Sequence, residues 1–452
     1  MIFNSHSLKA LKKYNMSHSY SSLSSRGKAL ATNPARIDFD IFMEASQNLY
    51  CPKENPNGTF PLNVAENSLT SSIIKNKLTS IIQQQEMPDW VMNYTQLLGH
   101  PEVRMEVAKF MEQYLCKCPI SADTIGFSAG ASAIIEVSSF VLANPNDVVV
   151  IPAPSYPMYT KDLGIKSGIE RYDLQTHFEL EEVGAQGPVN IELLDKAWSA
   201  LMAKGKCFKI LLITSPDNPT GCMYTTQELK QFANWCIQHK VHLIVNEIYG
   251  LSLIDTQDAE LQEDYRHEGD YASFATIMHE LKSDYLHLWY AFSKDFAMSG
   301  LRFGVVHSLN EAFMTGLTNM NIPHLVSNIT QWMIGEMLKD TDFVEGYIQE
   351  NKKRLNQSYK LVIKALKKLD VPYVPSRGSL FVWVDFSKYL KTNDAKGEEQ
   401  LWLDIYKNTG VLLTPGIGFQ HQKKGLFRIV YTAVSIAHLE IAMDKVITYF
   451  LE

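Results

Sequence analysis

The sequence lacks several features that would assign a chain to a particular class. It has no run of about 18 or more apolar residues that could cross a bilayer, and no apolar segment follows a basic start as in a secretory signal. Its six cysteines include no CxxC pair, and a chain of this length does not need disulfides to stabilise its core. We interpret the cysteines as reduced thiols and expect a cytoplasmic protein with no membrane partner.

Other absences exclude whole classes of ligand. The formal net charge of -7 and the isoelectric point near 6.0 leave no basic footprint for nucleic acid. Neither GxGxxG nor GxxxxGK[ST] occurs, so loops for dinucleotides and Walker-type phosphate loops are not supported. We therefore expect a small-molecule partner and no metal.

Residues 1–37 contain no acidic residue but six lysines and arginines, together with many serines. This composition is typical of transit peptides. A mobile basic tail that leads into the first helix is the interpretation we favour, because targeting signals of this kind are weak.

The residues that are present indicate a large globular protein. Apolar residues make up 46% and charged residues 20% of the 452 positions, and a chain of this length exceeds the size at which one core stops growing. Short apolar runs alternate with helical patterns from about residue 101 to 306, which is the rhythm of a parallel sheet. Strands covered on both faces are almost continuously apolar, and four segments fit that description: 148–152, 210–214, 243–246 and 286–291.

The helical periodicity and the later part of the chain complete the predicted organisation. Helices are expected over 101–115 and over 227–239, the second with Thr225 or Thr226 as its N-cap. Beyond residue 323 the pattern changes to long helices, notably 344–369, and then to short strands around 380–385 and 427–432. We expect an α/β fold with a large domain over 65–322 and a smaller α+β domain built from 1–64 and 323–452. The basic run 352–354 is interpreted as a solvated helix face.

One segment directly after an apolar strand carries a notable group of residues. Ser293 and Lys294 are followed by Gly300-Leu-Arg302-Phe-Gly304, at the position where open α/β sheets place their ligand crevices. A lysine after a strand is usually a solvated terminus, but the arginine framed by glycines favours a binding site.

The pattern of strand, Ser-Lys and Gly-x-Arg-x-Gly resembles the cofactor-lysine motif of the class I/II aminotransferase superfamily, the pyridoxal-phosphate-dependent enzymes of fold type I. The resemblance covers nearly the whole chain from about residue 23 to 450. It implies a large domain with a mostly parallel mixed sheet between helices, and pyridoxal 5′-phosphate as the cofactor. Lys294 would bind that cofactor as a Schiff base and carry the α-proton of the substrate, Ser293 would contact the cofactor, and Arg302 would bind the phosphate.

Further segments resemble other parts of such a site, in the order in which the superfamily has them. Ala131 and Ser132 open a predicted helix, where backbone amides and a hydroxyl can bind phosphate, although small residues there also serve as a plain N-cap. Tyr156, in Pro-Ser-Tyr-Pro, resembles the tyrosine that stacks on the pyridine ring. Asn218, in Asn-Pro-Thr-Gly, and Tyr249, in Asn-Glu-Ile-Tyr, resemble the two residues that bind the phenolic oxygen of the cofactor.

Three more residues complete the implied site. Arg428 in Gly-Leu-Phe-Arg resembles the arginine that binds the substrate α-carboxylate by a two-pronged pair. Tyr94 resembles the tyrosine that reaches the cofactor phosphate from the neighbouring subunit, which implies a homodimer with shared active sites. Glu66 in Ala-Glu-Asn resembles a substrate-facing glutamate of 1-aminocyclopropane-1-carboxylate synthase, whose substrate is S-adenosylmethionine; a surface carboxylate before a helix is the alternative.

Three departures separate the chain from the pattern of the superfamily. Asn246 stands where relatives have the aspartate that pairs with the pyridine nitrogen, and asparagine cannot supply the charge that keeps this nitrogen protonated. Ala291 replaces a serine that contributes a hydroxyl to the phosphate. Tyr94 lies five residues before Gly99, as in general aminotransferases, whereas the synthases have their tyrosine two residues before the corresponding glycine.

These observations leave three functions open. The first is an enzyme that acts on an α-amino acid by Schiff-base chemistry, of the aminotransferase or 1-aminocyclopropane-1-carboxylate synthase type. The second is a lyase or γ-replacement enzyme that acts on S-adenosylmethionine, as Glu66 indicates. The third is a non-catalytic relative that keeps the fold for binding or regulation, as Asn246 and Ala291 indicate.

Overall fold

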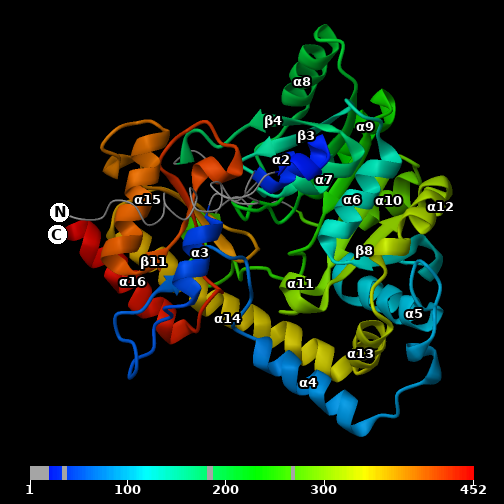
Figure 1. Cartoon of the computed structure of the whole chain (residues 1–452), viewed down its shortest axis with the longest axis horizontal. Coiled ribbons are helices and arrows are strands. Elements are labelled where there is room, and N and C mark those ends of the chain that lie inside the picture. Colours follow the sequence, from blue (N-terminus) through cyan, green and yellow to red (C-terminus); the bar gives the residue numbers. More distant parts are fainter. Residues whose placement is uncertain (1–19, 33–37, 181–186, 266–269) are drawn as a thin grey trace.

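The computed structural model describes residues 20–32, 38–180, 187–265 and 270–452 (Figure 1). Most of the acid-free stretch 1–37 lies outside these ranges. Within them, no helix is both long enough and apolar enough to cross a membrane, and no disulfide joins two cysteines.

A seven-stranded mixed sheet forms the centre of the larger part of the molecule. Its strand order is β2-β8-β7-β6-β5-β3-β4, and β8 alone runs antiparallel to its neighbours. The predicted mostly parallel, mixed sheet is therefore confirmed. The strands are β2 (Ile125–Ala129), β3 (Val148–Ala153), β4 (Glu170–Gln175), β5 (Phe208–Thr214), β6 (His242–Asn246), β7 (Leu286–Ala291) and β8 (Phe303–Ser308).

The four strands predicted from apolar runs are β3, β5, β6 and β7, and each is buried along most of its length. Helices on both faces explain that burial, because a sheet covered on two sides exposes neither set of side chains. The covering helices are α5 (Pro101–Phe110), α6 (Ala131–Leu142), α7 (Tyr159–Ser167), α8 (Ile191–Ala203), α9 (Thr226–His239), α10 (Phe274–Leu281) and α12 (Glu311–Met320).

Two helix predictions can be compared in detail. Thr225 is the N-cap of α9 and forms a capping box with Glu228, as its hydroxyl and the glutamate three residues later allow. The helix predicted over 101–115 is different, because α5 ends at Phe110 and the chain continues as a π-helix, Met111–Cys116. The apolar periodicity runs through both segments, so it does not reveal the change in hydrogen bonding.

The smaller part contains a four-stranded antiparallel sheet, in the order β12-β13-β10-β9, and the parallel pair β1-β11. Pairing of β1 with β11 joins Phe60 to Val411 and brings the N-terminal segment to the C-terminal part. The remaining elements are α2 (Ser25–Thr32), α3 (Phe39–Ser46), α4 (Ser71–Gln84), α13 (Asn328–Lys339), α14 (Thr341–Lys368), α15 (Ala395–Thr409), α16 (Ile436–Leu451), β1 (Phe60–Pro61), β9 (Tyr373–Val374), β10 (Phe381–Asp385), β11 (Val411–Leu412), β12 (Thr414–Pro415) and β13 (Leu426–Val430).

Helix α14 connects the two parts of the molecule. It runs from the side of α4 and α13 toward α15 and α16 (Figure 1). Its early residues Val344 and Tyr347 belong to the apolar cluster of the large sheet, whereas Leu355 and Tyr359 belong to the cluster of the smaller part. The domain boundaries expected from the sequence stay a prediction.

Candidate active site

Six of the seven strands of the large sheet end at one edge, and the candidate site lies there. All strands except β8 point the same way, so the residues that follow them meet at their carboxyl ends. Of the ten predicted cofactor residues, all except Tyr94 line one pocket. They are Ala131, Ser132, Tyr156, Asn218, Asn246, Tyr249, Ser293, Lys294 and Arg302.

Lys294 lies in the short helix α11 (Phe292–Asp295), directly after β7. Its Nζ donates a hydrogen bond to the backbone carbonyl of Ala65, at 2.5 Å. The next residue anchors the turn, because the carboxylate of Asp295 accepts hydrogen bonds from the backbone N–H of Leu251 at 3.0 Å and the hydroxyl of Ser252 at 2.6 Å. Burial raises the pKa of Asp295 to about 7. The lysine therefore projects into the pocket from a fixed turn.

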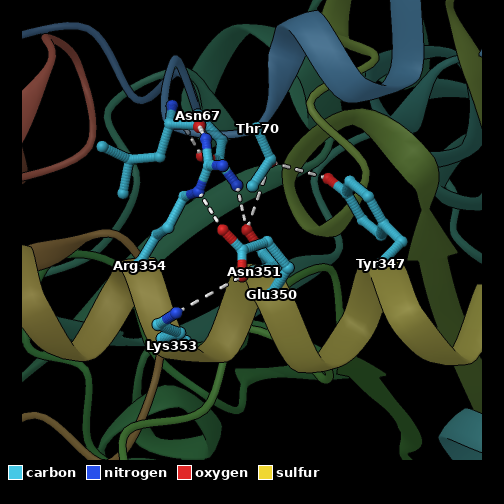
Figure 2. Close-up of polar contacts among 8 residues, drawn as sticks. Asn67, Thr70, Tyr347, Glu350, Asn351, Lys353 and Arg354 are labelled. Atoms are coloured by element: carbon cyan, nitrogen blue, oxygen red, sulfur yellow. Dashed lines mark hydrogen bonds and ion pairs between the residues drawn. The ribbon is translucent and has the colours of Figure 1, made fainter. Parts of the chain in front are cut away.

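Polar side chains of α14 contact the other side of this turn and also the segment of Asn67 and Thr70, which Figure 2 shows. Tyr347 donates from its hydroxyl to the carbonyl of Asp295 at 3.0 Å and lies 2.9 Å from the hydroxyl of Thr70. Asn351 accepts a hydrogen bond from the Asn67 amide at 2.8 Å. Because Asn67 follows Glu66, these contacts link the backbone beside Lys294 to the segment expected to face the substrate.

The basic run 352–354 is only partly the solvated face that the sequence predicts. Lys352 and Lys353 are exposed, but Arg354 bends toward the N-terminal segment (Figure 2). Its Nε lies 2.6 Å from Glu350, and its Nη1 donates to the carbonyl of Leu69 at 2.5 Å. The prediction is wrong for Arg354, because a long side chain at the edge of a helix can reach a neighbouring backbone.

Gly130, Arg302 and the first turn of α6 form the end of the pocket that suits a phosphate. The N-cap of α6 is Gly130, with φ of 83°, so no capping side chain covers the first amides of the helix. A Cβ on Gly130 would lie 2.5 Å from the guanidinium of Arg302. Glycine is therefore favoured by the backbone conformation, and a side chain there would displace the guanidinium of Arg302 from its present position. A helix N-terminus beside a guanidinium is a strong site for an anion.

Asp162, which sequence reasoning missed, lies beside this phosphate end. Burial raises its pKa to about 6, and a hydrogen bond with Ser132 and the charge of Arg302 partly offset that effect. The only sequence signal was its position in the first turn of α7. Ala291, the departure at the third position before Lys294, is fully buried at the end of β7 and offers no hydroxyl.

Asn246 stands at the end of β6 and is 5% exposed. Its Nδ2 donates to the hydroxyl of Tyr159 at 2.9 Å, and its Oδ1 accepts from the backbone N–H of Ile248 at 3.2 Å. Tyr159 also contacts Tyr156 edge to face, with ring centroids 5.2 Å apart. Tyr159 was not predicted as a site residue. The one indication in the sequence was that it lies three residues after Tyr156, the tyrosine expected to stack on the ring.

Asn218, Tyr249 and Arg428 are joined in one buried group. The Asn218 amide donates to the hydroxyl of Tyr249 at 3.5 Å and accepts from Nη1 of Arg428 at 2.9 Å. Arg428 also donates from Nη2 to the carbonyl of Asn63 at 2.6 Å. The guanidinium lies near the rings of Phe381 and Phe419, at 4.7 and 5.0 Å from their centroids. These contacts hold a buried positive charge beside the cofactor pocket.

Arg428 and the exposed Glu66 line a second pocket, which shares Ala65, Tyr156 and Lys294 with the first. The two pockets are therefore contiguous around the lysine, and the second provides a mouth for a substrate. Tyr94 is fully exposed and does not line either pocket.

Comparison with known proteins agrees with this geometry. Residues 60–446 match the family model described as aminotransferase class I and II. The chain is 29% identical over 434 residues to a 1-aminocyclopropane-1-carboxylate synthase from Glycine max, a match that covers 92% of this chain and 85% of that one. It is 28% identical to a mouse protein described as a probable inactive 1-aminocyclopropane-1-carboxylate synthase-like protein 2, over 94% of this chain and 71% of the relative.

Solved structures share the fold. An aspartate aminotransferase from Thermotoga maritima superposes with a TM-score of 0.72 at 20% identity, covering 95% of this chain and all of that one (100%). An archaeal alanine:glyoxylate aminotransferase superposes with a TM-score of 0.79 at 18% identity, covering 96% and 99%.

The chain belongs to the aminotransferase class I and II family. It is a pyridoxal-phosphate-dependent enzyme of the transferase or lyase type, and pyridoxal 5′-phosphate is its cofactor. The pocket fits that group, because it offers an amine for the aldehyde, a helix N-terminus with an arginine for the phosphate, and tyrosines for the ring.

Proposed function

We propose that this enzyme acts on an α-amino acid through Schiff-base chemistry at Lys294. The observation that carries the proposal is that Lys294 lines both the cofactor pocket and the adjoining mouth, with Arg302 in the first and Arg428 in the second. One amine thus lies between a cation suited to a phosphate and a cation suited to a carboxylate. That is the arrangement needed to bring a cofactor and an amino acid together.

In this proposal, the side chains of the candidate site have distinct roles. When bound, pyridoxal phosphate supplies an aldehyde and an electron-withdrawing ring. Lys294 would hold that group through its amine, and the same amine would accept the α-proton of the substrate at Nζ. The carbonyl of Ala65, 2.5 Å away, orients the amine. Arg428 holds the substrate α-carboxylate, and the neighbouring aromatic rings exclude water from the pair.

We also propose a homodimer with shared active sites. Tyr94 is fully exposed although it is an aromatic residue, and Met92 beside it is 82% exposed. An exposed aromatic and apolar surface of this kind is typical of a contact with another subunit. In the dimer, Tyr94 would reach the cofactor phosphate of the neighbouring subunit.

The reaction type divides the proposal into two candidates. Transamination needs only the α-carboxylate site and the lysine. Elimination or replacement at the γ-carbon of S-adenosylmethionine is favoured by Glu66, whose carboxylate lines the mouth and can face a sulfonium cation. The curated relatives named as 1-aminocyclopropane-1-carboxylate synthases support this second candidate. A purely binding role, for which the mouse relative is a precedent by its name, is not favoured here because Lys294 and Arg302 are both present.

A product assay distinguishes these candidates. The purified protein, loaded with pyridoxal phosphate, is incubated with S-adenosylmethionine alone and with a panel of amino acids plus a keto acid. A new amino acid derived from the keto acid supports transamination, and loss of methylthioadenosine from S-adenosylmethionine supports the lyase. Absence of product in both arms would contradict the proposed activity and leave the binding role.

A further inference from the structure

The side-chain amide of Asn246 is held in one orientation, because one of its neighbours is a hydrogen-bond donor that cannot accept. The backbone N–H of Ile248 can only donate, so the amide atom 3.2 Å from it must be the acceptor Oδ1. Nδ2 is then the atom 2.9 Å from the hydroxyl of Tyr159. The reversed amide would place two N–H donors against each other at Ile248, so the hydrogen-bond network fixes the assignment.

Tyr159 can accept from this amide because a phenolic oxygen accepts hydrogen bonds whichever way its second hydrogen bond runs. Its hydroxyl lies 2.8 Å from the hydroxyl of Thr214, and Thr214 and Asn246 are directly paired on β5 and β6. The tyrosine is 1% exposed, and burial raises its pKa, so it remains a neutral phenol. Asn246, Tyr159 and Thr214 therefore form a fixed chain of hydrogen bonds at the edge of the cofactor pocket.

One N–H of Asn246 remains for a ligand. The amide nitrogen carries two hydrogens, and among the described residues it makes a single hydrogen bond, to Tyr159. Asn246 is buried and lines the pocket. A buried N–H without an acceptor is costly, whereas a second lone pair left unused on a carbonyl costs less. A ligand atom at this position is therefore favoured when it accepts a hydrogen bond.

We propose that Tyr159 is a positioning residue that directs the second N–H of Asn246 toward the ring nitrogen of pyridoxal phosphate, so that this nitrogen is bound unprotonated. The inference rests on the proposed function, because it takes the cofactor to lie in this pocket with its ring nitrogen at Asn246. Its consequence is chemical: a neutral ring withdraws electrons less strongly than a pyridinium does. Tyr159 and Asn246 thus lower the electron-withdrawing power of the cofactor ring while they keep the cofactor bound.

The test is ¹⁵N NMR of the protein reconstituted with pyridoxal phosphate labelled at the ring nitrogen. The wild-type protein is expected to give the chemical shift of an unprotonated, hydrogen-bonded pyridine. Asn246→Asp serves as the matched control and is expected to give the shift of a pyridinium, because the carboxylate accepts from a ring N–H. Tyr159→Phe is expected to move the wild-type signal toward that of a pyridine without a hydrogen bond. It should also weaken cofactor binding by about two- to tenfold, the range of one hydrogen bond.

A second variant covers the case in which Tyr159→Phe does not fold. Thr214→Val removes the hydroxyl that Tyr159 contacts and is expected to shift the nitrogen signal in the same direction, by less. A pyridinium signal in the wild-type protein would overturn the inference. So would folded Tyr159→Phe and Thr214→Val proteins that both give the same nitrogen signal as the wild-type protein. Borohydride treatment distinguishes a failure of the proposed function from a failure of this inference alone. A protein that carries no covalent pyridoxyl group would overturn the proposed function and this inference together, whereas a labelled protein with a protonated nitrogen would overturn this inference alone.

Discussion

The two walls of the active site are built in different ways. The cofactor wall consists of residues that closely follow strands of the large sheet, such as Asn218 after β5 and Lys294 after β7. The mouth, in contrast, joins segments far apart in the chain. Arg428, for example, donates to the carbonyl of Asn63, 365 residues away. The cofactor wall is therefore set by the local order of strands and loops, whereas the mouth depends on how the N-terminal segment packs against the C-terminal part.

This comparison predicts that changes in the two walls affect different steps. A change in the cofactor wall should alter the binding or chemistry of pyridoxal phosphate for every substrate. A change in the mouth should alter the KM for substrate and leave the cofactor bound.

The largest effect is expected at Lys294 in the cofactor wall. Lys294→Ala removes both the amine that binds the aldehyde and the group that takes the α-proton, so kcat should fall by at least about 10²–10⁴-fold, the contribution of one general base. Steady-state kinetics on the substrate found in the product assay gives this value. Lys166→Ala, which removes a surface lysine paired with Glu136, is the control and should leave kcat unchanged. A similar loss in both variants would contradict the role of Lys294.

Arg428→Ala in the mouth should give the next largest effect. Truncation of a buried, charge-paired donor costs about 2–5 kcal/mol, so kcat/KM should fall roughly 30- to 4,000-fold, mainly through KM. Cofactor affinity, followed by absorbance during dialysis, should change far less. Arg428→Lys keeps the charge but loses the two-pronged geometry, so it should restore only part of the loss. An unchanged KM in Arg428→Ala would refute the carboxylate role.

Asn246→Asp changes a residue of the cofactor wall, and it should raise a reaction rate where the two preceding variants lower one. The carboxylate restores the charge that keeps the ring nitrogen protonated, so α-proton exchange of a bound amino acid should accelerate by on the order of tenfold, equivalent to ~1.4 kcal/mol. Deuterium incorporation at the α-carbon, measured by mass spectrometry, gives the rate. If the asparagine is instead adapted to another reaction, the native reaction should slow or turn to transamination. Equal exchange rates in the two proteins would show that the argument about this position is wrong.

Glu66→Gln in the mouth should give the smallest effect and the most selective one. The exposed carboxylate faces solvent, so its loss should raise the KM for a cationic substrate such as S-adenosylmethionine by about two- to fivefold, as for an exposed ion pair. The KM for a neutral amino acid should not change. Glu399→Gln, at an exposed position of α15, is the control. Equal shifts for cationic and neutral substrates would remove the specificity assigned to Glu66.

The same contrast explains how much could be predicted from the sequence. β7 was predicted with its observed bounds because five of its six residues are apolar, as in strands that are buried on both faces, and Lys294 lies in the turn that follows it. In the large sheet, β2, β4 and β8 were not predicted. β4 lies at the edge of the sheet, where its polar residues resemble a loop. The order of strands in the sheet was also not predicted, because pairing depends on contacts between residues distant in the chain.

The candidate site shows the same limit. Nine residues that line the pocket could be named from motifs, but Tyr159, which also lines it, and Asp162 could not, because each matters through a contact with a residue from another element. The polar links from Tyr347 and Asn351 to the turn of Lys294 likewise arise only when α14 packs beside α11. Sequence patterns identify groups with a chemical task of their own more readily than groups that position others.

The central claim is that Lys294 carries the cofactor, and borohydride reduction followed by peptide mapping tests it most directly. The purified protein, loaded with pyridoxal phosphate, is reduced and digested, and the pyridoxyl group is located by mass spectrometry, with Lys294→Ala treated in parallel. The account predicts a single label on Lys294 and none on the variant. A label on another lysine, or an equal label on the variant, would contradict it.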